Sequence, residues 1–211
     1  MATVLALPET QARPPRIRNR ATREGALLSA AGRLFASRGY EATTTREIAA
    51  EAGCAEGLIH RYFQGKAGLL LALIRSRLSQ EVADLAEKLP LTPNLETEFL
   101  QLVEFEVERM WSERDFFRVI IPRAILDPAL GPVVRGLGPT RRARTIAERL
   151  RAFPESRQFS NEQLEALADS VGLLGFMFGF VRPVVLGDDR RRALEMACTM
   201  AKLLVPRQQI V

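Results

Sequence analysis

The sequence predicts an all-α fold. Hydrophobic residues make up 47% of the 211 positions, which is enough to bury a core and too much for a disordered chain. Strands are not expected, because runs of β-branched residues with period two are nearly absent. Apolar residues recur instead at helical spacing, and residues that favour helix ends stand between these segments. We therefore expect about nine helices, in a small N-terminal domain and a larger C-terminal helical domain.

The chain begins with a segment that lacks apolar periodicity. Residues 1–20 contain two adjacent prolines, and Arg13, Arg16, Arg18 and Arg20 follow in near alternation. We expect a flexible basic arm here. A helix should follow over about residues 21–38, because its apolar residues fall on one face and Gly39 is suited to end it.

The stretch from Thr43 to Lys66 indicates two short helices joined by a tight turn. Thr44 and Glu47 have the spacing of a capping box, so the first of these helices should begin at Thr45. Gly53 then stands where a chain that leaves a helix needs a positive φ. The second short segment must turn part of its polar surface outward. Two such helices joined by a Gly-containing turn predict a helix-turn-helix.

The run from Leu27 to Leu70 also resembles the DNA-binding domain of the tetracycline-repressor (TetR) family of bacterial regulators. The matching pieces, in order, are AAGRLFASRGY, TTTREIAAEAG and GLIHRYFQGKAGLL. The sequence departs from the family pattern at Gly65 and Gly68, which we expect to loosen the start of the next helix. The resemblance implies a helix-turn-helix DNA-binding domain over residues 21–66.

The resemblance also implies a function. Members of this family are homodimeric transcriptional regulators, and a repressor of this kind is released from double-stranded operator DNA by a small-molecule effector. The residues facing phosphates would be Thr45, Arg46, His60, Tyr62 and Lys66, and those nearest the base edges would be Glu56, Gly57, Leu58 and Arg61. The sequence leaves open the operator, the effector and the choice between repressor and activator.

The charge distribution agrees with a nucleic-acid partner for the N-terminal domain. The first 80 residues carry 12 Lys and Arg against 6 Glu, whereas the rest of the chain carries 18 basic against 19 acidic residues. A surface that binds a polyanion requires such an excess of positive charge. The arm over residues 1–20 either enters the minor groove of DNA or is a solubilising tail, and the sequence supports both interpretations equally.

A helix over residues 66–88 should link the two domains, and residues 89–211 should form the effector-binding and dimerisation domain. Thr92 followed by Pro93 has the pattern of an N-cap with Pro at the first helical position. The helix that they open should extend to about Trp111. It is apolar over most of its circumference, which is typical of a central, buried helix.

The next two segments are predicted from their prolines and their charges. Residues 115–130 are strongly apolar and should be broken by Pro122 and Pro128. A basic helix should follow over about residues 139–153. Its five Arg are expected to form a solvated face rather than a second DNA-binding surface.

The last two helices are expected to form the dimer interface. A second capping box opens a helix over residues 160–182, which Pro183 should end. Two Asp residues favour the start of a final helix over residues 188–204. Because the first of these helices is apolar all round, we expect both to pair with their copies as a four-helix bundle. Burial within one subunit is the alternative.

Glu106 falls in the middle of the apolar stripe of the helix that ends near Trp111. A buried carboxylate is costly, so it must find a partner, and Arg118 and Arg182 are the candidates. Glu106 either forms a structural ion pair or anchors an apolar or aromatic effector through a donor or positive group. The effector pocket would be lined by Phe99, Val103, Glu106, Met110, Trp111, Phe116, Phe117, Ile120, Phe176, Met177 and Phe180.

The sequence does not predict an enzyme, a cofactor or a metal site. It has one His and two Cys, without a Gly-rich phosphate loop or a nucleophile elbow. The N-terminus lacks the basic region of a signal peptide, and the longest uncharged stretch, Ser170–Val181, is too short to span a membrane. We therefore expect a cytoplasmic protein. The alternative function is an all-α ligand-binding or protein-interaction module whose helix-turn-helix is only structural.

Overall fold

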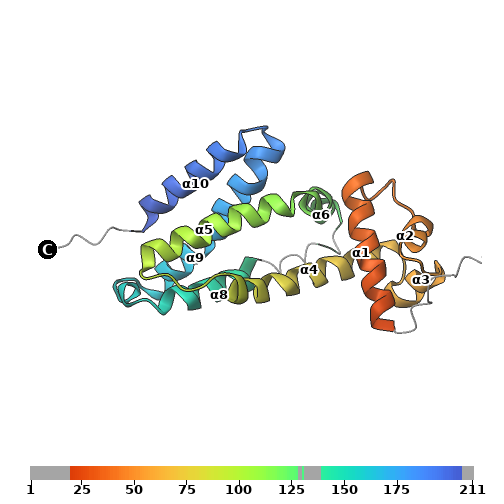
Figure 1. The fold of residues 1–211 in the computed structure, drawn as a ribbon, viewed down its shortest axis with the longest axis horizontal. Coiled ribbons are helices and arrows are strands. Elements are labelled where there is room, and N and C mark those ends of the chain that lie inside the picture. The colour runs from red at the N-terminus through yellow and green to blue at the C-terminus, as the bar shows by residue number, and fades with distance from the viewer. Residues whose placement is uncertain (1–19, 128–129, 131–138, 206–211) are drawn as a thin grey trace, which may run out of the picture.

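The computed structural model describes residues 20–127, 130 and 139–205. Within these ranges the chain forms nine α-helices and no strand, so the all-α prediction is confirmed. Figure 1 shows α1, α2 and α3 grouped at one end, and α4 leading from them to a longer helical bundle. The basic arm predicted over residues 1–20 lies outside the described residues, except for Arg20.

The N-terminal helices begin and end close to their predicted positions. They are α1 (Arg20–Arg38), α2 (Thr45–Glu51), α3 (Gly57–Phe63) and α4 (Lys66–Lys88). The predicted capping box of α2 is formed, because Thr44 and Glu47 each accept the backbone N–H of the other. Gly53 has a φ of +62°, as the turn after α2 requires. The core between these helices contains Leu27, Phe35, Ile48, Ile59, Leu69 and Leu70.

Gly68 does not loosen α4 but allows α3 and α4 to meet. A Cβ atom at Gly68 would lie 1.6 Å from the carbonyl oxygen of Phe63. The turn between the two helices also has left-handed backbone, with a φ of +61° at Gln64 and +105° at Gly65. The expectation of a loose helix start is therefore wrong, because these glycines permit a close contact between backbones.

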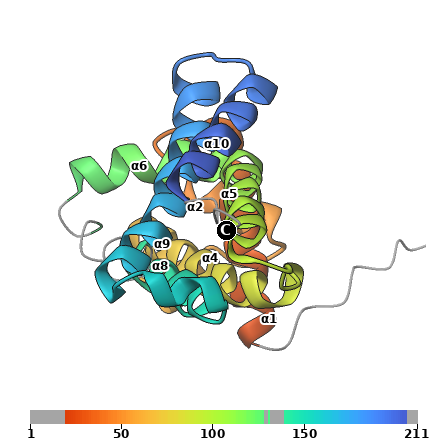
Figure 2. The ribbon, with the colours of Figure 1, turned by 90° about the vertical axis from the view of Figure 1, so that its left-hand side faces the viewer.

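The C-terminal bundle, seen end-on in Figure 2, is built around α5. Its elements are α5 (Leu95–Ser112), α6 (Arg114–Leu126), α8 (Pro139–Arg151), the short 3-10 helix η1 (Pro154–Gln158), α9 (Asn161–Phe176), the π-helix η2 (Met177–Val185) and α10 (Arg190–Leu204). Helix α5 packs against α9, α10 and η2. Its buried residues Phe99, Leu102 and Val103 belong to the core of this bundle. The prediction of a central, buried helix is therefore confirmed.

Helix α5 begins at Leu95 rather than at the predicted Thr92–Pro93 pair. Asn94 is its N-cap, and the Asn94 side chain accepts the backbone N–H of Thr97 at 2.9 Å. Thr92 instead donates its backbone N–H (2.9 Å) and its hydroxyl (3.0 Å) to the carboxylate of Glu98. Glu98 is fully buried, and a buried carboxylate without donors is costly. Thr92 supplies such donors, while Asn94 already caps the helix.

Two prolines lie inside helices that they were expected to end. Helix α6 continues through Pro122. This residue is exposed, so the carbonyl that loses its hydrogen bond lies on the solvent side, where water can satisfy it. After Phe176 the chain passes into a π-helix that runs through Pro183. Pro128, the third proline in the prediction, lies outside the described residues.

Two buried ion pairs join α5 to α8. Glu98 pairs with Arg149 and Glu106 pairs with Arg142, and the exposed fractions of these four side chains range from 0 to 11%. The acid nearer the start of α5 meets the base nearer the end of α8, as antiparallel helices require. The predicted solvated face is therefore only part of α8, which uses two of its five Arg to neutralise buried carboxylates.

The continuous helix from Asn161 to Val185 is long and apolar enough to cross a membrane by length and composition. Half of its most apolar window is buried within the fold. The core helix of a water-soluble protein has the same properties, so this helix is weak evidence for a membrane span.

Two glycines allow α9 and η2 to contact α5 closely. A Cβ at Gly175 would lie 2.2 Å from Cγ of Glu106, and a Cβ at Gly179 would lie 2.3 Å from the carbonyl oxygen of Val107. Neither neighbour can move away freely, because both belong to the buried central helix and interiors are close-packed. The distance between α5 and the α9–η2 helix therefore depends on these glycines.

Replacing Gly175 by Ala should lower the free energy of unfolding by about 1–3 kcal/mol, the usual cost of overpacking a core. Gly172 is a matched control on the same helix, because a Cβ there would meet nothing within 4 Å. Gly172→Ala should leave stability unchanged or raise it by up to about 1 kcal/mol through helix propensity. Urea denaturation measures both effects. Equal midpoints for the two variants would contradict the proposed contact.

Candidate DNA-binding surface and effector region

The helix-turn-helix presents a polar and mostly exposed surface. Ile59 is fully buried and fixes one side of α3 in the N-terminal core. Among the residues predicted to contact DNA, the exposed ones are Arg46, Glu56, Gly57, His60 and Arg61, and the half-buried ones are Thr45, Leu58, Tyr62 and Lys66. The structure therefore leaves the side chains of α3 that follow Ile59 accessible to a large partner.

A hydrogen bond ties the beginning of α2 to the beginning of α3. The hydroxyl of Thr45 donates to a carboxylate oxygen of Glu56 at 2.6 Å. These two residues were predicted to contact different parts of DNA, and in the free protein they contact each other. The bond helps to fix the relative position of the two helices.

Lys66 was predicted to face a DNA phosphate, but in the structure its side chain turns toward the loop between α1 and α2. Its Nζ donates to the carbonyl oxygens of Tyr40 (2.8 Å) and Thr43 (3.0 Å), both in the loop between α1 and α2. The same ammonium lies 4.3 Å from the centre of the Tyr40 ring. In the free protein, carbonyl groups of the loop therefore bind the Lys66 ammonium.

Arg20, the last Arg of the predicted basic arm, lies beside the predicted DNA-binding surface. It is the first residue of α1, and its guanidinium lies 5.2 Å from the centre of the Tyr62 ring in α3. It also forms an ion pair with Glu24 at 2.7 Å. Helix α1 therefore starts next to α3, which brings a basic residue to the helix-turn-helix.

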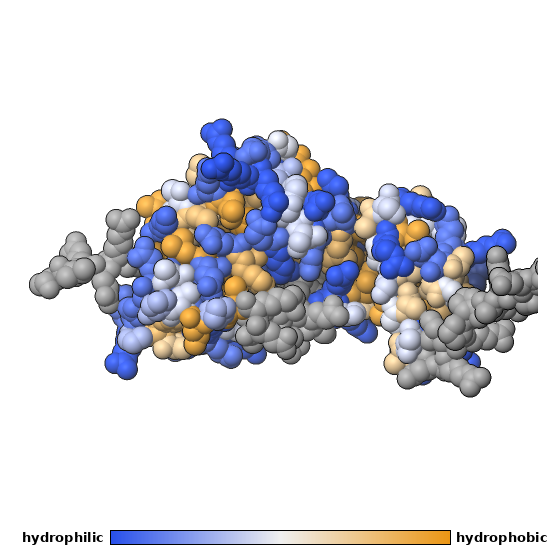
Figure 3. All heavy atoms as spheres, viewed as in Figure 1, coloured by the Kyte–Doolittle hydropathy of each residue, from blue (hydrophilic) through white to orange (hydrophobic). Residues whose placement is uncertain are grey.

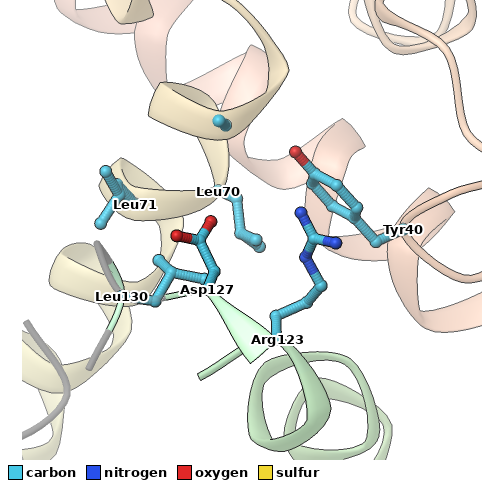
Figure 4. A pocket seen from close by; sticks show the side chains of 7 residues that line it. Tyr40, Leu70, Leu71, Arg123, Asp127 and Leu130 are labelled. Carbon is cyan, nitrogen blue, oxygen red and sulfur yellow. The ribbon is translucent and has the colours of Figure 1, made fainter. Parts of the chain in front are cut away.

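A small cavity of about 50 Å³ lies where α6 meets the N-terminal helices (Figure 4). It is lined by Tyr40, Ala67, Leu70, Leu71, Arg123, Asp127 and Leu130. The guanidinium of Arg123 lies 4.4 Å from the centre of the Tyr40 ring. Burial raises the pKa of the Tyr40 hydroxyl, and the positive charge of Arg123 opposes this shift. The predicted site residues do not line this cavity.

Glu106 is buried, as predicted, with only 1% of its surface exposed. Its partners are Arg109 on its own helix and Arg142 on α8, not the predicted Arg118 and Arg182. Arg118 is exposed and pairs with Asp115 at 3.3 Å, and Arg182 pairs with Asp188 at 2.5 Å. The spacing of three residues between Glu106 and Arg109 was a local signal for this pair, whereas Arg142 had none.

The predicted effector residues separate into two cores. Phe99 and Val103 are fully buried in the core of the C-terminal bundle. Ile120 belongs instead to the N-terminal core, and Phe116 packs against it. The two ends of the set therefore pack into different cores, and a single pocket lined by all of these residues stays a prediction.

A chain of aromatic rings remains between these two cores. Phe116 contacts Phe117, Phe117 contacts Phe180, and Phe180 stacks on Phe176, with ring centres 5.6–5.9 Å apart. The guanidinium of Arg109 lies 6.0 Å from the centre of the Phe117 ring. Of two further predicted residues, Met110 is buried and Met177 is exposed. The arrangement joins α6 to the α9–η2 helix through aromatic faces.

Trp111 has two guanidinium groups close to its ring. Arg114 and Arg190 lie 4.7 and 5.2 Å from its ring. Arg190 also pairs with Glu108, which connects the start of α10 to α5. The single Trp of the chain is therefore held where α5, α6 and α10 meet.

Comparisons with known proteins agree with this geometry. Residues 27–73, which include α2 and α3, match the tetR family of bacterial regulatory proteins. The HTH-type transcriptional regulator BetI of Rhizobium meliloti is 36% identical over 101 residues, which are 47% of this chain and 50% of that protein. The chain thus aligns with only about half the length of this curated relative.

The similarity of fold extends over most of the chain. A transcriptional regulator of Saccharomonospora viridis in complex with choline has a TM-score of 0.65 and 22% identity, covering 90% of this chain and 98% of the other. The transcriptional regulator FadR of Bacillus subtilis in complex with stearoyl-CoA has a TM-score of 0.62 and 15% identity, covering 86% and 97%. At these identities the two structures indicate a shared fold.

The predicted resemblance is confirmed by two independent comparisons. The sequence match covers the helix-turn-helix and its neighbouring helices. The structural matches extend over the helical bundle that follows. The matched proteins are regulators and not enzymes. Over residues 27–73 the chain is similar to the tetR family of bacterial regulatory proteins, and over most of its length it shares the fold of the two regulators above.

Proposed function

We propose that the protein is a homodimeric transcriptional repressor that binds operator DNA through α2 and α3. The observation that carries this proposal is the exposure of Arg46, His60 and Arg61 on the segment that matches the family. Positive and hydrogen-bonding side chains on a short helix suit phosphates and base edges. In this proposal residues 21–66 bind DNA, residues 89–211 bind the effector and form the dimer, and the protein acts in the cytoplasm.

The salt dependence of binding to a labelled mixed-sequence duplex tests the DNA contacts. Arg46→Ala should reduce the magnitude of the slope of log K against log salt by about one unit, because it removes one phosphate contact. Lys66→Ala should leave the slope unchanged and lower the melting temperature, because Lys66 bonds the loop carbonyls of Tyr40 and Thr43.

Arg157→Ala is the matched control for removal of a positive charge. Arg157 is exposed in η1, at the opposite end of the molecule from α3. Its removal should leave both the slope and the affinity unchanged. If the wild-type protein does not bind DNA at low salt, the alternative of a purely structural helix-turn-helix is correct.

We propose that α9, η2 and α10 form the dimer interface. Ala193, Ala197 and Ala201 face inward and are at most 3% exposed. The opposite side of α10 carries Met196, Met200 and Leu203, which are 42, 42 and 81% exposed. Leu173 and Met177 on the α9–η2 helix are also exposed, at 68 and 43%. Figure 3 shows apolar residues on the side of the molecule that carries α10. Exposed apolar side chains on neighbouring helices are suited to association.

Charged substitutions on this surface should separate the dimer. We expect the wild-type protein to sediment as a dimer at micromolar concentration, and Leu173→Glu and Met200→Glu to sediment as monomers. Leu91→Glu is the control, because Leu91 is 64% exposed in the segment before α5. A monomeric wild-type protein, or dimeric Leu173→Glu and Met200→Glu variants, would exclude this interface.

We propose that a small apolar or aromatic effector binds beside the ring chain Phe117–Phe180–Phe176 and Trp111. Apolar sites with few polar groups are typical of small-molecule binding. Two regulators of similar fold were solved with choline and with stearoyl-CoA, which supports a small-molecule ligand for a protein of this fold. Glu106 is not a free anchor in this proposal, because Arg109 and Arg142 already neutralise it.

The fluorescence of Trp111 provides a direct measurement, because the chain has one Trp. Titration with a panel of aromatic and aliphatic compounds should identify ligands that change this emission. Phe180→Ala should weaken their binding by about three- to tenfold, the amount expected for one lost aromatic contact. Phe159→Ala is the control, because Phe159 packs against the core of the C-terminal bundle next to η1 and is not part of the ring chain. A panel that leaves the emission unchanged, or equal losses in both variants, would contradict the proposed site.

A further inference from the structure

The loop between α1 and α2 determines how α2 begins. It contains Tyr40 and Glu41 and ends at Thr44, the N-cap of α2. Thr43 donates its hydroxyl to the carbonyl oxygen of Gly39 at 2.8 Å, which closes the loop from within. Helix α2 has seven residues, and helices of this length are not stable in isolation, so its orientation depends on contacts at its ends.

Two cations hold this loop from opposite parts of the chain. Lys66 of α4 donates to the carbonyl oxygens of Tyr40 and Thr43. Arg123 of α6 forms an ion pair with Glu41 at 2.7 Å, and its guanidinium lies 4.4 Å from the centre of the Tyr40 ring. Figure 4 shows the Arg123 side chain rising from α6 beside this ring.

The environment of Arg123 favours a strong contact. Its side chain is only 27% exposed, whereas its partner Glu41 is 77% exposed. A cation–π contact contributes more when the cation is partly desolvated, and an exposed ion pair contributes little. The cation–π contact with Tyr40 is therefore the stronger link between α6 and the loop. The ion pair with Glu41 orients the Arg123 guanidinium.

We propose that Arg123 is a positioning residue for DNA binding. From α6, outside the helix-turn-helix, it holds Tyr40 and Glu41 and thereby fixes the start of α2, where Thr45 and Arg46 are placed. Arg123 itself contacts no DNA. This inference rests on the proposed DNA-binding function, and it assigns to that function a residue that neither the sequence pattern nor the family match over residues 27–73 includes.

The test compares Arg123→Ala, Arg123→Lys and Arg118→Ala in the full chain. Arg118 is the matched control, because it lies on the same helix, is exposed and pairs only locally with Asp115 among the interactions described. Two quantities are measured: amide hydrogen exchange over residues 40–52 without DNA, and affinity for the labelled mixed-sequence duplex over a range of salt concentrations.

Arg123→Ala should speed exchange over residues 40–52 and weaken DNA binding by about three- to tenfold at constant salt, as loss of one cation–π contact predicts. The slope of log K against log salt should not change, because no phosphate contact is lost. Arg123→Lys retains a cation and should recover part of the affinity. Arg118→Ala should behave like the wild-type protein in both measurements.

The outcomes separate this inference from the proposed function. If the wild-type protein binds DNA and Arg123→Ala binds equally well, the positioning role is wrong while the proposed function stands. If Arg123→Ala reduces the magnitude of the salt slope by about one unit, Arg123 contacts a phosphate, and this result would also overturn the inference. A wild-type protein that does not bind DNA would overturn both.

Glu41→Gln covers the case in which Arg123→Ala does not fold. Glu41 is largely exposed, so this variant removes the ion pair without disturbing the core. It should change exchange and affinity in the same direction as Arg123→Ala, and by a smaller factor. Unchanged exchange and unchanged affinity in Glu41→Gln would then count against the inference.

Discussion

The structure depends on a buried carboxylate in the middle of α5. Glu106 is 1% exposed and lies between Arg109 and Arg142, while Gly175 of α9 packs directly on its Cγ. Removing one partner of such a buried pair typically costs about 3–5 kcal/mol, because the remaining charge has no compensation. The positions of α8 and α9 against α5 are therefore determined at one point, and the Glu98–Arg149 pair fixes the angle of α8 at a second.

This arrangement changes the role that Glu106 can have. An acid that already binds two guanidinium groups does not offer a free acceptor to a ligand, so the structural ion pair is the better explanation of its burial. In the proposed function, recognition of an effector then falls to aromatic faces, and Phe117 contacts Phe180 and lies near the guanidinium of Arg109. A ligand selected in this way would be recognised chiefly by shape and by its apolar surface.

The sequence predicted the features that depend on neighbouring residues. The capping box at Thr44 and the helix over residues 66–88 follow from local spacing, and both are present. The partners of Lys66 and Glu106 could not be obtained in this way. Lys66 meets carbonyl groups more than twenty residues away, and Arg142 comes from another helix, whose rotation about its axis is set by packing. Pro122 was misjudged for a related reason, since only the fold shows that it faces solvent.

Helix α6 contacts both parts of the molecule, and this limits how they can move relative to each other. Phe117 near its beginning contacts Phe180 of the C-terminal bundle, whereas Ile120 and Arg123, one and two turns later, contact the N-terminal helices. Close-packed interiors do not deform continuously, so a displacement of α6 that improves one set of contacts must alter the other. A displacement of Phe117 can therefore be transmitted to Tyr40 through α6 alone, a helix of thirteen residues.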